Sequence, residues 1–388
     1  MTDLFAPLQS LKQGHWFKLI CGASFQHLPA VRSLTLAYTL AGADCIDVAA
    51  DPAVIAAAQA ALQVARGLTR DAQERGFGYK GNLPFLMVSL NDGEDPHFRK
   101  AEFNATDCPT DCPRPCERIC PAQAIVFNPI KDDFSGVISQ KCYGCGRCIP
   151  ICPYDIIYTS SYMSTPGAIA PLVMSTGVDA VEIHTKVGRL AEFQRLWQAI
   201  SPWVDKLKVV AISCPDGEGM VDYLRALYDL ITPCPSTLIW QTDGRPMSGD
   251  IGDGTTLAAV KLAQKVLAAK LSGYVQLAGG TNSYTVAKLK AMGLLQREAE
   301  RQRGRGVEWN SYFPPSPHPP LPPSISGVAY GSYARVLLSP ILEQLENKEV
   351  SNTSVKATVR LEDEPELLWQ AVGLAHSLVS QLKSQQER

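Results

Sequence analysis

The sequence has no excess of positive charge. Its 36 lysines and arginines stand against 38 aspartates and glutamates, so the formal net charge is -2, and the sequence pI is about 6.3. A protein that binds the backbone of DNA or RNA needs a basic surface. The charge balance therefore argues against nucleic acid as a partner.

Long hydrophobic runs are also missing. The most apolar stretch, residues 41–65, is interrupted by Asp44, Asp47 and Asp51. A carboxylate at the centre of a membrane costs about 3 kcal/mol, so this stretch is no membrane span. The first 16 residues lack the charged and then apolar pattern of a secretory signal. We therefore expect a soluble, cytoplasmic protein.

Cysteine, by contrast, is plentiful. The chain has 12 cysteines, and eight of them lie between residues 108 and 152. The cytoplasm keeps thiols reduced, so clustered cysteines there bind metal more often than they form disulfides. The other four lie among apolar neighbours, and we expect them to be small buried thiols. They are Cys21, Cys45, Cys214 and Cys234.

Short apolar runs alternate with helical patterns on both sides of the cysteine-rich segment. Runs that are apolar on both faces and separated by helices are typical of parallel strands. We count eight, at residues 17–21, 45–49, 85–89, 180–184, 208–212, 237–241, 274–277 and 327–330. Eight parallel β/α units close a TIM barrel. The predicted fold is therefore an α/β, (β/α)8 TIM-like barrel, with an open doubly wound sheet as the alternative.

The second half of the cysteine-rich segment has the C-x2-C-x2-C-x3-C-P spacing of bacterial-type ferredoxins. Its ligands are Cys142, Cys145, Cys148 and Cys152. Three thiolates two residues apart can wrap three corners of one cubane, and Gly144 and Gly146 let the backbone approach it closely. A zinc site is the alternative, but it would leave the trailing Cys-Pro unexplained.

The first half has a wider spacing with the same Cys-Pro ending. Its ligands are Cys108, Cys112, Cys116 and Cys120. In two-cluster ferredoxins the last cysteine of each run ligates the other cluster. By that rule Cys120 joins the second-run cluster, and Cys152 joins Cys108, Cys112 and Cys116. We predict two 4Fe–4S clusters, of which the first-run cluster could instead be labile or of the 3Fe–4S form.

These patterns divide the chain into four parts. Residues 1–91 contain strands 1–3, residues 92–163 form a ferredoxin-like insert after strand 3, and residues 164–345 contain strands 4–8. A charged and then proline-rich linker at 297–324 is interpreted as an extended spacer, with a partner-docking strip as the alternative. Residues 346–388 form a tail with one helix, from residue 364 to about 383.

The carboxyl ends of the strands are where a TIM barrel builds its sites, and the insert leaves the barrel at this face. The candidate mouth residues are Cys21, Ser24, Asp47, Asn91, His184, Cys214, Asp243, Asn282 and Arg335. Of these, His184 lies near Glu182 and is interpreted as an ordinary strand residue. No pair of nucleophile and base is evident among the strand ends.

Two glycine-bearing loops follow the last two strands. Barrels often bind phosphate between these loops, through free N–H groups and a helix N-terminus. We therefore predict a site for a flavin or another phosphate-bearing ligand, with Arg335 paired to the anion and residues 243–254 covering it. The alternative is that the glycines merely end their strands. The predicted site residues are Gly279, Gly280, Thr281, Asn282, Gly331, Ser332 and Arg335.

This combination of motifs resembles the cyanobacterial light-dependent period (LdpA) family. The resemblance covers both cysteine runs, with the unusual spacing of the first, and segments 243–254 and 278–282, and it extends to about residue 333. It implies an iron–sulfur protein with redox-active, oxygen-sensitive clusters that relays cellular redox state, as a proxy for light, to the circadian clock.

The partners that the resemblance implies are clock-input histidine kinases and Kai clock proteins. No established reaction comes with it. The alternative is therefore an oxidoreductase, in which the clusters pass electrons to a flavin or substrate in the barrel mouth. Whether the protein is an enzyme stays open at this point.

Overall fold

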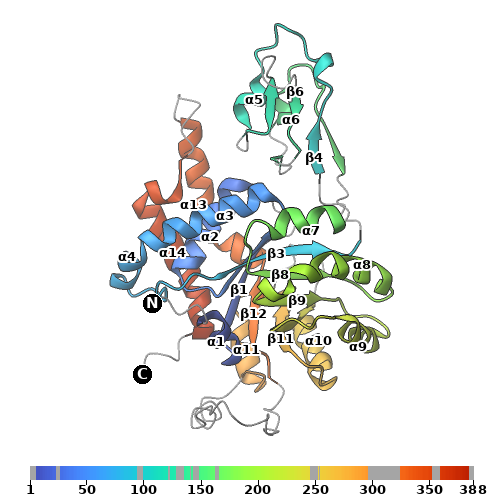
Figure 1. Ribbon diagram of the computed structural model, residues 1–388. Helices are drawn as coiled ribbons and strands as arrows, with labels where there is room; N and C mark the ends of the chain where they lie inside the picture. The colour runs from blue at the N-terminus through green and yellow to red at the C-terminus, as the bar shows by residue number, and fades with distance from the viewer. Residues whose placement is uncertain are drawn as a thin grey trace.

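The computed structural model describes twelve segments of the chain, and everything below concerns these residues. They are 6–22, 27–93, 99–120, 123–127, 135–139, 141–142, 148–161, 166–244, 252, 254–295, 324–351 and 359–383. The predicted linker at 297–324 lies outside them except for Ser324. Figure 1 shows a barrel with a small module projecting from it, in which β4 (Arg99–Glu102), β6 (Ser135–Val137), α5 (Pro115–Ile119) and α6 (Cys148–Ile151) are labelled.

Eight parallel strands close into a barrel in the order β1-β12-β11-β10-β9-β8-β3-β2. All eight lie where the apolar runs predicted them, so the TIM barrel is confirmed and the open sheet is wrong. The strands are β1 (Trp16–Gly22), β2 (Cys45–Ala49), β3 (Phe85–Asn91), β8 (Ala180–His184), β9 (Val209–Ser213), β10 (Leu238–Asp243), β11 (Tyr274–Ala278) and β12 (Gly327–Tyr330).

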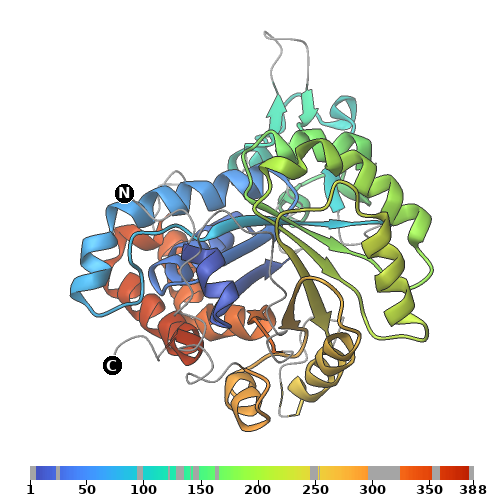
Figure 2. The ribbon, with the colours of Figure 1, turned by 60° about the horizontal axis from the view of Figure 1, so that its bottom comes forward.

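Helices cover the outside of the strands (Figure 2). They are α2 (Leu28–Leu40), α3 (Pro52–Gly67), α4 (Thr69–Glu74), α7 (Pro166–Met174), α8 (Leu190–Ile200), α9 (Met220–Leu230), α10 (Thr256–Ala268), α11 (Thr285–Ala291), α13 (Ser332–Ser351) and α14 (Pro365–Lys383), with 3-10 turns η2 (Ser201–Lys206) and η3 (Leu361–Asp363). The start of α3 follows its sequence, because Asp51 accepts a hydrogen bond from the backbone of Ala53 and Pro52 is the first helical residue. No helix in the described segments is long and apolar enough to cross a membrane.

The barrel interior has an apolar floor and a polar upper half. Near the amino ends of the strands, Trp16, Phe85 and Ile239 pack together with Leu11 of α1 (Ala6–Lys12). Gly327 makes room for Trp16, since a Cβ at that position would lie 2.3 Å from the Trp16 carbonyl oxygen. Nearer the carboxyl ends, the inward positions carry charged and amide side chains, and this change places the polar groups at the barrel mouth.

The tail helix belongs to the outer layer of the barrel. Helix α14 begins and ends close to the predicted residues and packs against α2 and α13. A bidentate ion pair joins Arg32 of α2 to Glu362 of η3. The predicted boundary between residues 345 and 346 falls inside α13, because the helix continues through the polar but helix-favouring stretch that the prediction assigned to the tail.

Three of the four scattered cysteines are buried as expected, namely Cys21, Cys45 and Cys214. The expectation is wrong for Cys234, which is exposed. It lies between Pro233 and Pro235 in the loop from α9 to β10. That loop runs over the surface, where the side chain has no core to pack against.

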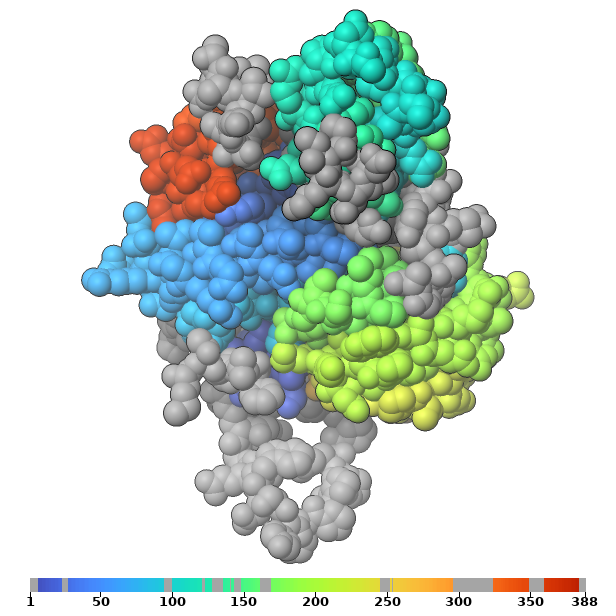
Figure 3. Space-filling view, turned by 45° about the horizontal axis from the view of Figure 1, so that its top comes forward, coloured from blue at the N-terminus to red at the C-terminus, as the bar shows by residue number. Residues whose placement is uncertain are grey.

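The projecting module consists of short elements, coloured cyan to green in Figure 3. Antiparallel pairs join β4 (Arg99–Glu102) to β7 (Tyr158–Ser161) and β5 (Ile125–Phe127) to β6 (Ser135–Val137). The remaining elements are the turn η1 (Ala105–Asp107) and the helices α5 (Pro115–Ile119) and α6 (Cys148–Ile151). The module lies between β3 and β8, which pair directly with each other in the barrel.

Candidate functional site

Four cysteines of the module come together from two distant segments. Cys108 follows η1, Cys112 lies in the next turn, and Cys116 lies in α5. Burial, together with the neighbouring Cys152, Cys108 and Cys112, raises the pKa of the Cys116 thiol to about 11. Burial and the neighbouring Cys112 and Cys152 likewise raise the pKa of the Cys108 thiol. These four thiols are the set that the crossing rule predicts for one cluster.

The two cysteine runs have matching backbones at their ends. Each ends just after a short helix, α5 before Cys120 and α6 before Cys152. Three residues beyond each of these cysteines the backbone is left-handed, with φ of 49° at Gln123 and 51° at Asp155. The amide of each left-handed residue donates to the carbonyl oxygen of its cysteine, at 3.1 Å and 3.4 Å. The sequence pseudo-repeat is therefore also a structural one.

Backbone amides of the module donate hydrogen bonds to cysteine sulfurs. Ala101 donates to Cys142 and Arg114 to Cys112, both at 3.4 Å, and Ala124 donates to Cys120 at 3.2 Å. Amides directed at sulfur stabilise the negative charge of ligated thiolates and tune the potential of a cluster. The donor set therefore fits iron–sulfur clusters.

Apolar side chains enclose the same sulfurs. Ile125 and Ile157, each five residues beyond the last cysteine of a run, are buried and pack with the cysteines. Cys116, Cys142, Cys148 and Cys152 are all buried in this small core. An apolar shell limits the access of water to a cluster. Cys145, also predicted as a ligand, lies outside the described residues.

The module is joined to the barrel by charged side chains as well as by the chain itself. Lys100 of β4 lies 3.5 Å from Asp51, at the start of α3. Where β3 ends, Asp92 accepts hydrogen bonds from Thr185 and from Arg189, the latter at 3.2 Å. These contacts fix the base of the module at the carboxyl face of the barrel, as the position of the insert predicts.

A charged network fills the upper half of the barrel. Lys18 of β1 is fully buried, forms an ion pair with Glu182 of β8 and lies 2.8 Å from Asp47 of β2. Burial lowers the pKa of an ammonium, but the two carboxylates outweigh it and raise the pKa of Lys18 above its ordinary value. The lysine is therefore a charged partner of the carboxylates rather than a neutral nucleophile.

Neutral side chains extend this network across the barrel. Gln241 of β10 donates to Glu182 and accepts from Lys18 at 3.1 Å. Gln276 of β11 donates to Gln241 at 2.6 Å and accepts from the Trp16 indole at 2.6 Å. Sequence reasoning missed the lysine and both glutamines. The available signal is a polar residue in the middle of an otherwise apolar strand, which marks the residue but does not show which way its side chain points.

The upper rim of the network holds His184 and Asp243, which were both predicted as mouth residues. His184 Nε2 lies 3.2 Å from a carboxylate oxygen of Glu182. Asp243 accepts hydrogen bonds from Ser213 and, at 3.4 Å, from Gln241. His184 thus belongs to a polar cluster and is not the isolated strand residue that its sequence context suggested.

Of the predicted anion-site residues, Arg335 has its guanidinium turned towards main-chain carbonyls. It donates to Ile20 at 3.0 Å and to Cys21 at 3.4 Å, and also to Ser332 Oγ at 3.0 Å. Burial lowers the pKa of Arg335 from its ordinary value. The predicted role of Arg335 as partner of an anion remains a prediction, and in this structure its contacts join β1 to α13.

The loop after β11 is held by its own contacts. Gly279 and Gly280 have φ of 66° and 89°, which other residues rarely adopt. The Gly280 carbonyl accepts from the hydroxyl of Thr255 at 2.7 Å, and Thr281 donates to the Ala329 carbonyl of β12 at 2.7 Å. The glycines therefore make the turn that brings this loop against its neighbours. Gly331 and Ser332 follow β12 on the same face.

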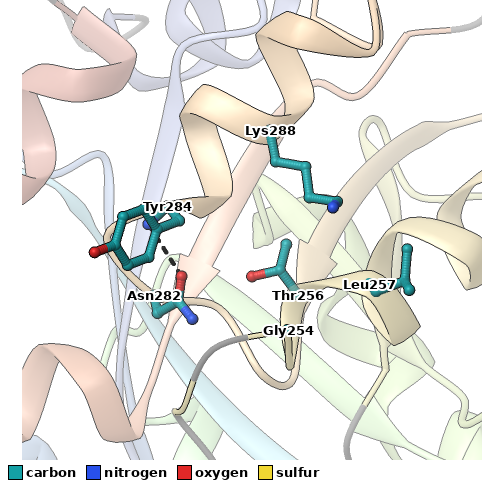
Figure 4. Close-up of a pocket in the computed structure, with 6 residues that line it drawn as sticks. All are labelled: Gly254, Thr256, Leu257, Asn282, Tyr284 and Lys288. Atoms are coloured by element: carbon teal, nitrogen blue, oxygen red, sulfur yellow. Dashed lines mark hydrogen bonds between the residues drawn. The ribbon is translucent and has the colours of Figure 1, made fainter.

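A pocket of about 300 Å³ lies beside this loop, between the amino ends of α10 and α11. Figure 4 shows Lys288 extending from α11 towards Thr256 and Leu257 of α10. The pocket includes Asn282 but none of the other predicted anion-site residues. It is lined by Gly254, Thr256, Leu257, Asn282, Tyr284 and Lys288.

Comparison with solved structures finds (S)-3-O-geranylgeranylglyceryl phosphate synthase from Thermoplasma acidophilum, in complex with its substrate sn-glycerol-1-phosphate. The identity is 11% over 99% of each chain, with a TM-score of 0.37. A likeness this weak carries no argument about function. The barrel itself is established by the strand order.

Comparison with known sequences is far more specific. Residues 108–163 match the LdpA Fe–S cluster-binding domain, and residues 172–381 match the light dependent period A C-terminal domain. The protein Light dependent period A of Synechococcus elongatus is 47% identical over 377 residues, which cover 97% of this chain and 94% of that protein. The chain therefore belongs to the light dependent period A family and carries the iron–sulfur cluster-binding domain of that family.

Proposed function

We propose that this protein is a redox sensor whose module holds two 4Fe–4S clusters. The observation that carries the proposal is the convergence of four thiols from two segments, Cys108, Cys112 and Cys116 with Cys152. Bacterial-type two-cluster ferredoxins exchange their last ligands in this way. The remaining cysteines, Cys120, Cys142, Cys145 and Cys148, would hold the second cluster.

The clusters would respond to the redox state of the cell. When bound, they accept and release single electrons at potentials set by their environment. The protein contributes buried sulfurs, amide donors and the apolar side chains Ile125 and Ile157. Cys108 is less buried than Cys112 and Cys116, so oxidants would reach the first-run cluster by way of Cys108.

The signal would pass to protein partners. The relative in Synechococcus elongatus is named for a light-dependent period. As the family resemblance implies, the present chain would relay redox state, as a proxy for light, to the circadian clock, through clock-input histidine kinases and Kai clock proteins. Large side chains near the cysteines are exposed, including Ile119, Ile151 and Tyr158. They offer a contact surface that a change in the clusters would alter directly.

The alternative is an oxidoreductase, and a specific observation favours it. The upper barrel contains buried charges, and a purely structural barrel has little use for them because burying ions costs free energy. In that case the clusters would feed a flavin or substrate at the mouth. The cofactor would take its phosphate to the loops after β11 and β12, as the sequence predicts, or to the nearby pocket at Lys288.

Anaerobically purified full-length protein separates these possibilities. Two clusters require about eight irons per chain. An EPR-monitored redox titration should then show two reducible centres. A sensor should bind a partner with an affinity that differs between the oxidised and reduced states, and its visible spectrum should show iron–sulfur absorption alone. A co-purifying flavin would favour the oxidoreductase, and fewer than four irons would contradict both proposals.

A further inference from the structure

Three carboxylates lie near one another in the upper half of the barrel, and two of them, Asp47 and Glu182, form ion pairs with the Lys18 ammonium. Asp47 and Glu182 are buried and Asp243 is half-buried. Within the described segments, Lys18 is the one lysine or arginine that forms ion pairs with any of them. Burying a carboxylate away from water without a positively charged partner costs free energy. The group therefore favours an additional positive charge.

Three possible metal ligands converge above Lys18. A carboxylate oxygen of Glu182, a ring nitrogen of His184 and a carboxylate oxygen of Asp243 all lie within 4.8 Å of one another. A bound Zn²⁺ lies about 2.1 Å from such ligands, which brings the ligand atoms to within roughly 4 Å of one another. The two half-buried side chains, His184 and Asp243, can close the difference by rotating slightly.

Uncharged groups position these ligands from the side and from below. Gln241 donates to Glu182 and to Asp243, and its own oxygen is occupied by Lys18 and Gln276. Ser213, from the strand between β8 and β10, donates to Asp243. Groups that orient metal ligands in this way are typical of metal sites. The upper side of the cluster faces the mouth, since His184 and Asp243 are both partly exposed.

We propose that Glu182, His184 and Asp243 bind one divalent transition-metal cation at the carboxyl end of the barrel. One imidazole with two carboxylates suits Zn²⁺, Fe²⁺ or Mn²⁺, whereas Mg²⁺ and Ca²⁺ prefer oxygen ligands alone. Three protein ligands leave further positions for water or for an oxygen-bearing substrate. The site is separate from the module cysteines and does not depend on the function proposed above.

The test uses the full-length protein with its clusters assembled anaerobically and in the oxidised state. Mn²⁺ alone is titrated at room temperature, and the loss of the free Mn²⁺ EPR signal measures binding. Zn²⁺ is then added as a competitor, and it should displace Mn²⁺ because it binds such ligands more tightly. We expect one Mn²⁺ per chain. His184→Gln and Asp243→Asn should each weaken its binding by at least about tenfold.

Matched variants control for general effects. His376→Gln removes a half-buried histidine on α14, and Asp222→Asn removes an exposed carboxylate on α9, and both should bind Mn²⁺ like the unaltered protein. Iron content is measured in every variant, so a loss of clusters is distinguished from a loss of the mouth site. The proposal is overturned if Mn²⁺ does not bind, or if both mouth variants bind Mn²⁺ as tightly as the controls.

Discussion

Lys18 of β1 and Glu182 of β8 form an ion pair across the inside of the barrel, and neither side chain is exposed. The two residues are 164 positions apart in the sequence. Their contact exists only once the barrel has formed. It joins the part of the chain before the module to the part after it.

Replacing Lys18 tests what this pair contributes. Lys18→Met leaves Asp47 and Glu182 buried together, and we expect the free energy of unfolding to fall by about 3–5 kcal/mol. Tryptophan fluorescence during urea unfolding would report on the barrel, because the chain has no tryptophan between residues 108 and 163.

Lys265→Met is the matched control. Lys265 forms a partly exposed ion pair with Asp216, so its replacement should cost about 1 kcal/mol or less. If the two variants lose the same stability, the buried pair has no special role.

The crossing of ligands between the runs predicts which variants should resemble each other. Cys112→Ser and Cys152→Ser should lose the same cluster, while Cys120→Ser and Cys142→Ser should lose the other. Each should retain about four irons, since a cubane holds four. EPR spectra of the reduced proteins would sort the variants into pairs. Cys234→Ser, which alters an exposed thiol outside both runs, should keep full iron content. Pairing of Cys112→Ser with Cys120→Ser instead would show that each run holds its own cluster.

The first-run cluster should be the more sensitive to air. Its run is longer and interrupted by prolines, and Cys108 is only half-buried, so its sulfurs are shielded less well. Cys145→Ser should leave this cluster in place and Cys112→Ser the other one. Timed exposure to air followed by EPR compares their decay. The expectation is wrong if the cluster that remains in Cys112→Ser decays first.

Alkylation should distinguish Cys234 from the buried thiols. Burial raises the pKa of Cys21 and of Cys214 to about 12, so at pH 8 both are protonated, and it is the thiolate that reacts. We expect one rapidly labelled cysteine outside the two runs in the native, cluster-loaded protein, as measured by mass spectrometry. Cys234→Ser should abolish that labelling. Rapid modification of Cys21 or Cys214 would contradict their burial.

The fold could be predicted well because apolar residues dominate each barrel strand, so that each strand stands out from the helices around it. The same property hides the direction of each side chain. Residue 18 lies within an apolar run, and its sequence gives no indication that it faces inwards, where Glu182 and Asp47 meet it. Which residues of a strand point into the barrel is known only once the strands have closed into it.

Arg335 illustrates a second limit. A basic residue beside a glycine-bearing loop is typical of an anion site, and this is what the sequence predicted. In the structure the guanidinium donates to carbonyl oxygens of β1, more than 300 residues earlier in the chain. The sequence of side chains does not show which main-chain carbonyls will accept hydrogen bonds from Arg335. The cysteine runs could be interpreted from the sequence because the spacing of the cysteines follows the geometry of cluster ligands.

The antiparallel pair of β4 and β7 closes the base of the module without help from the clusters. The strands on either side of the module, β3 and β8, are already hydrogen-bonded in the barrel, and the Arg99–Ser161 pair holds the base of the module together. The two ends of the module are therefore held together by the barrel strands and the β4–β7 pair. The cysteine ligands do not have to supply the entropy of closing this loop. We therefore expect loss of both clusters to unfold the module while the barrel stays folded, so that iron content and barrel stability change independently.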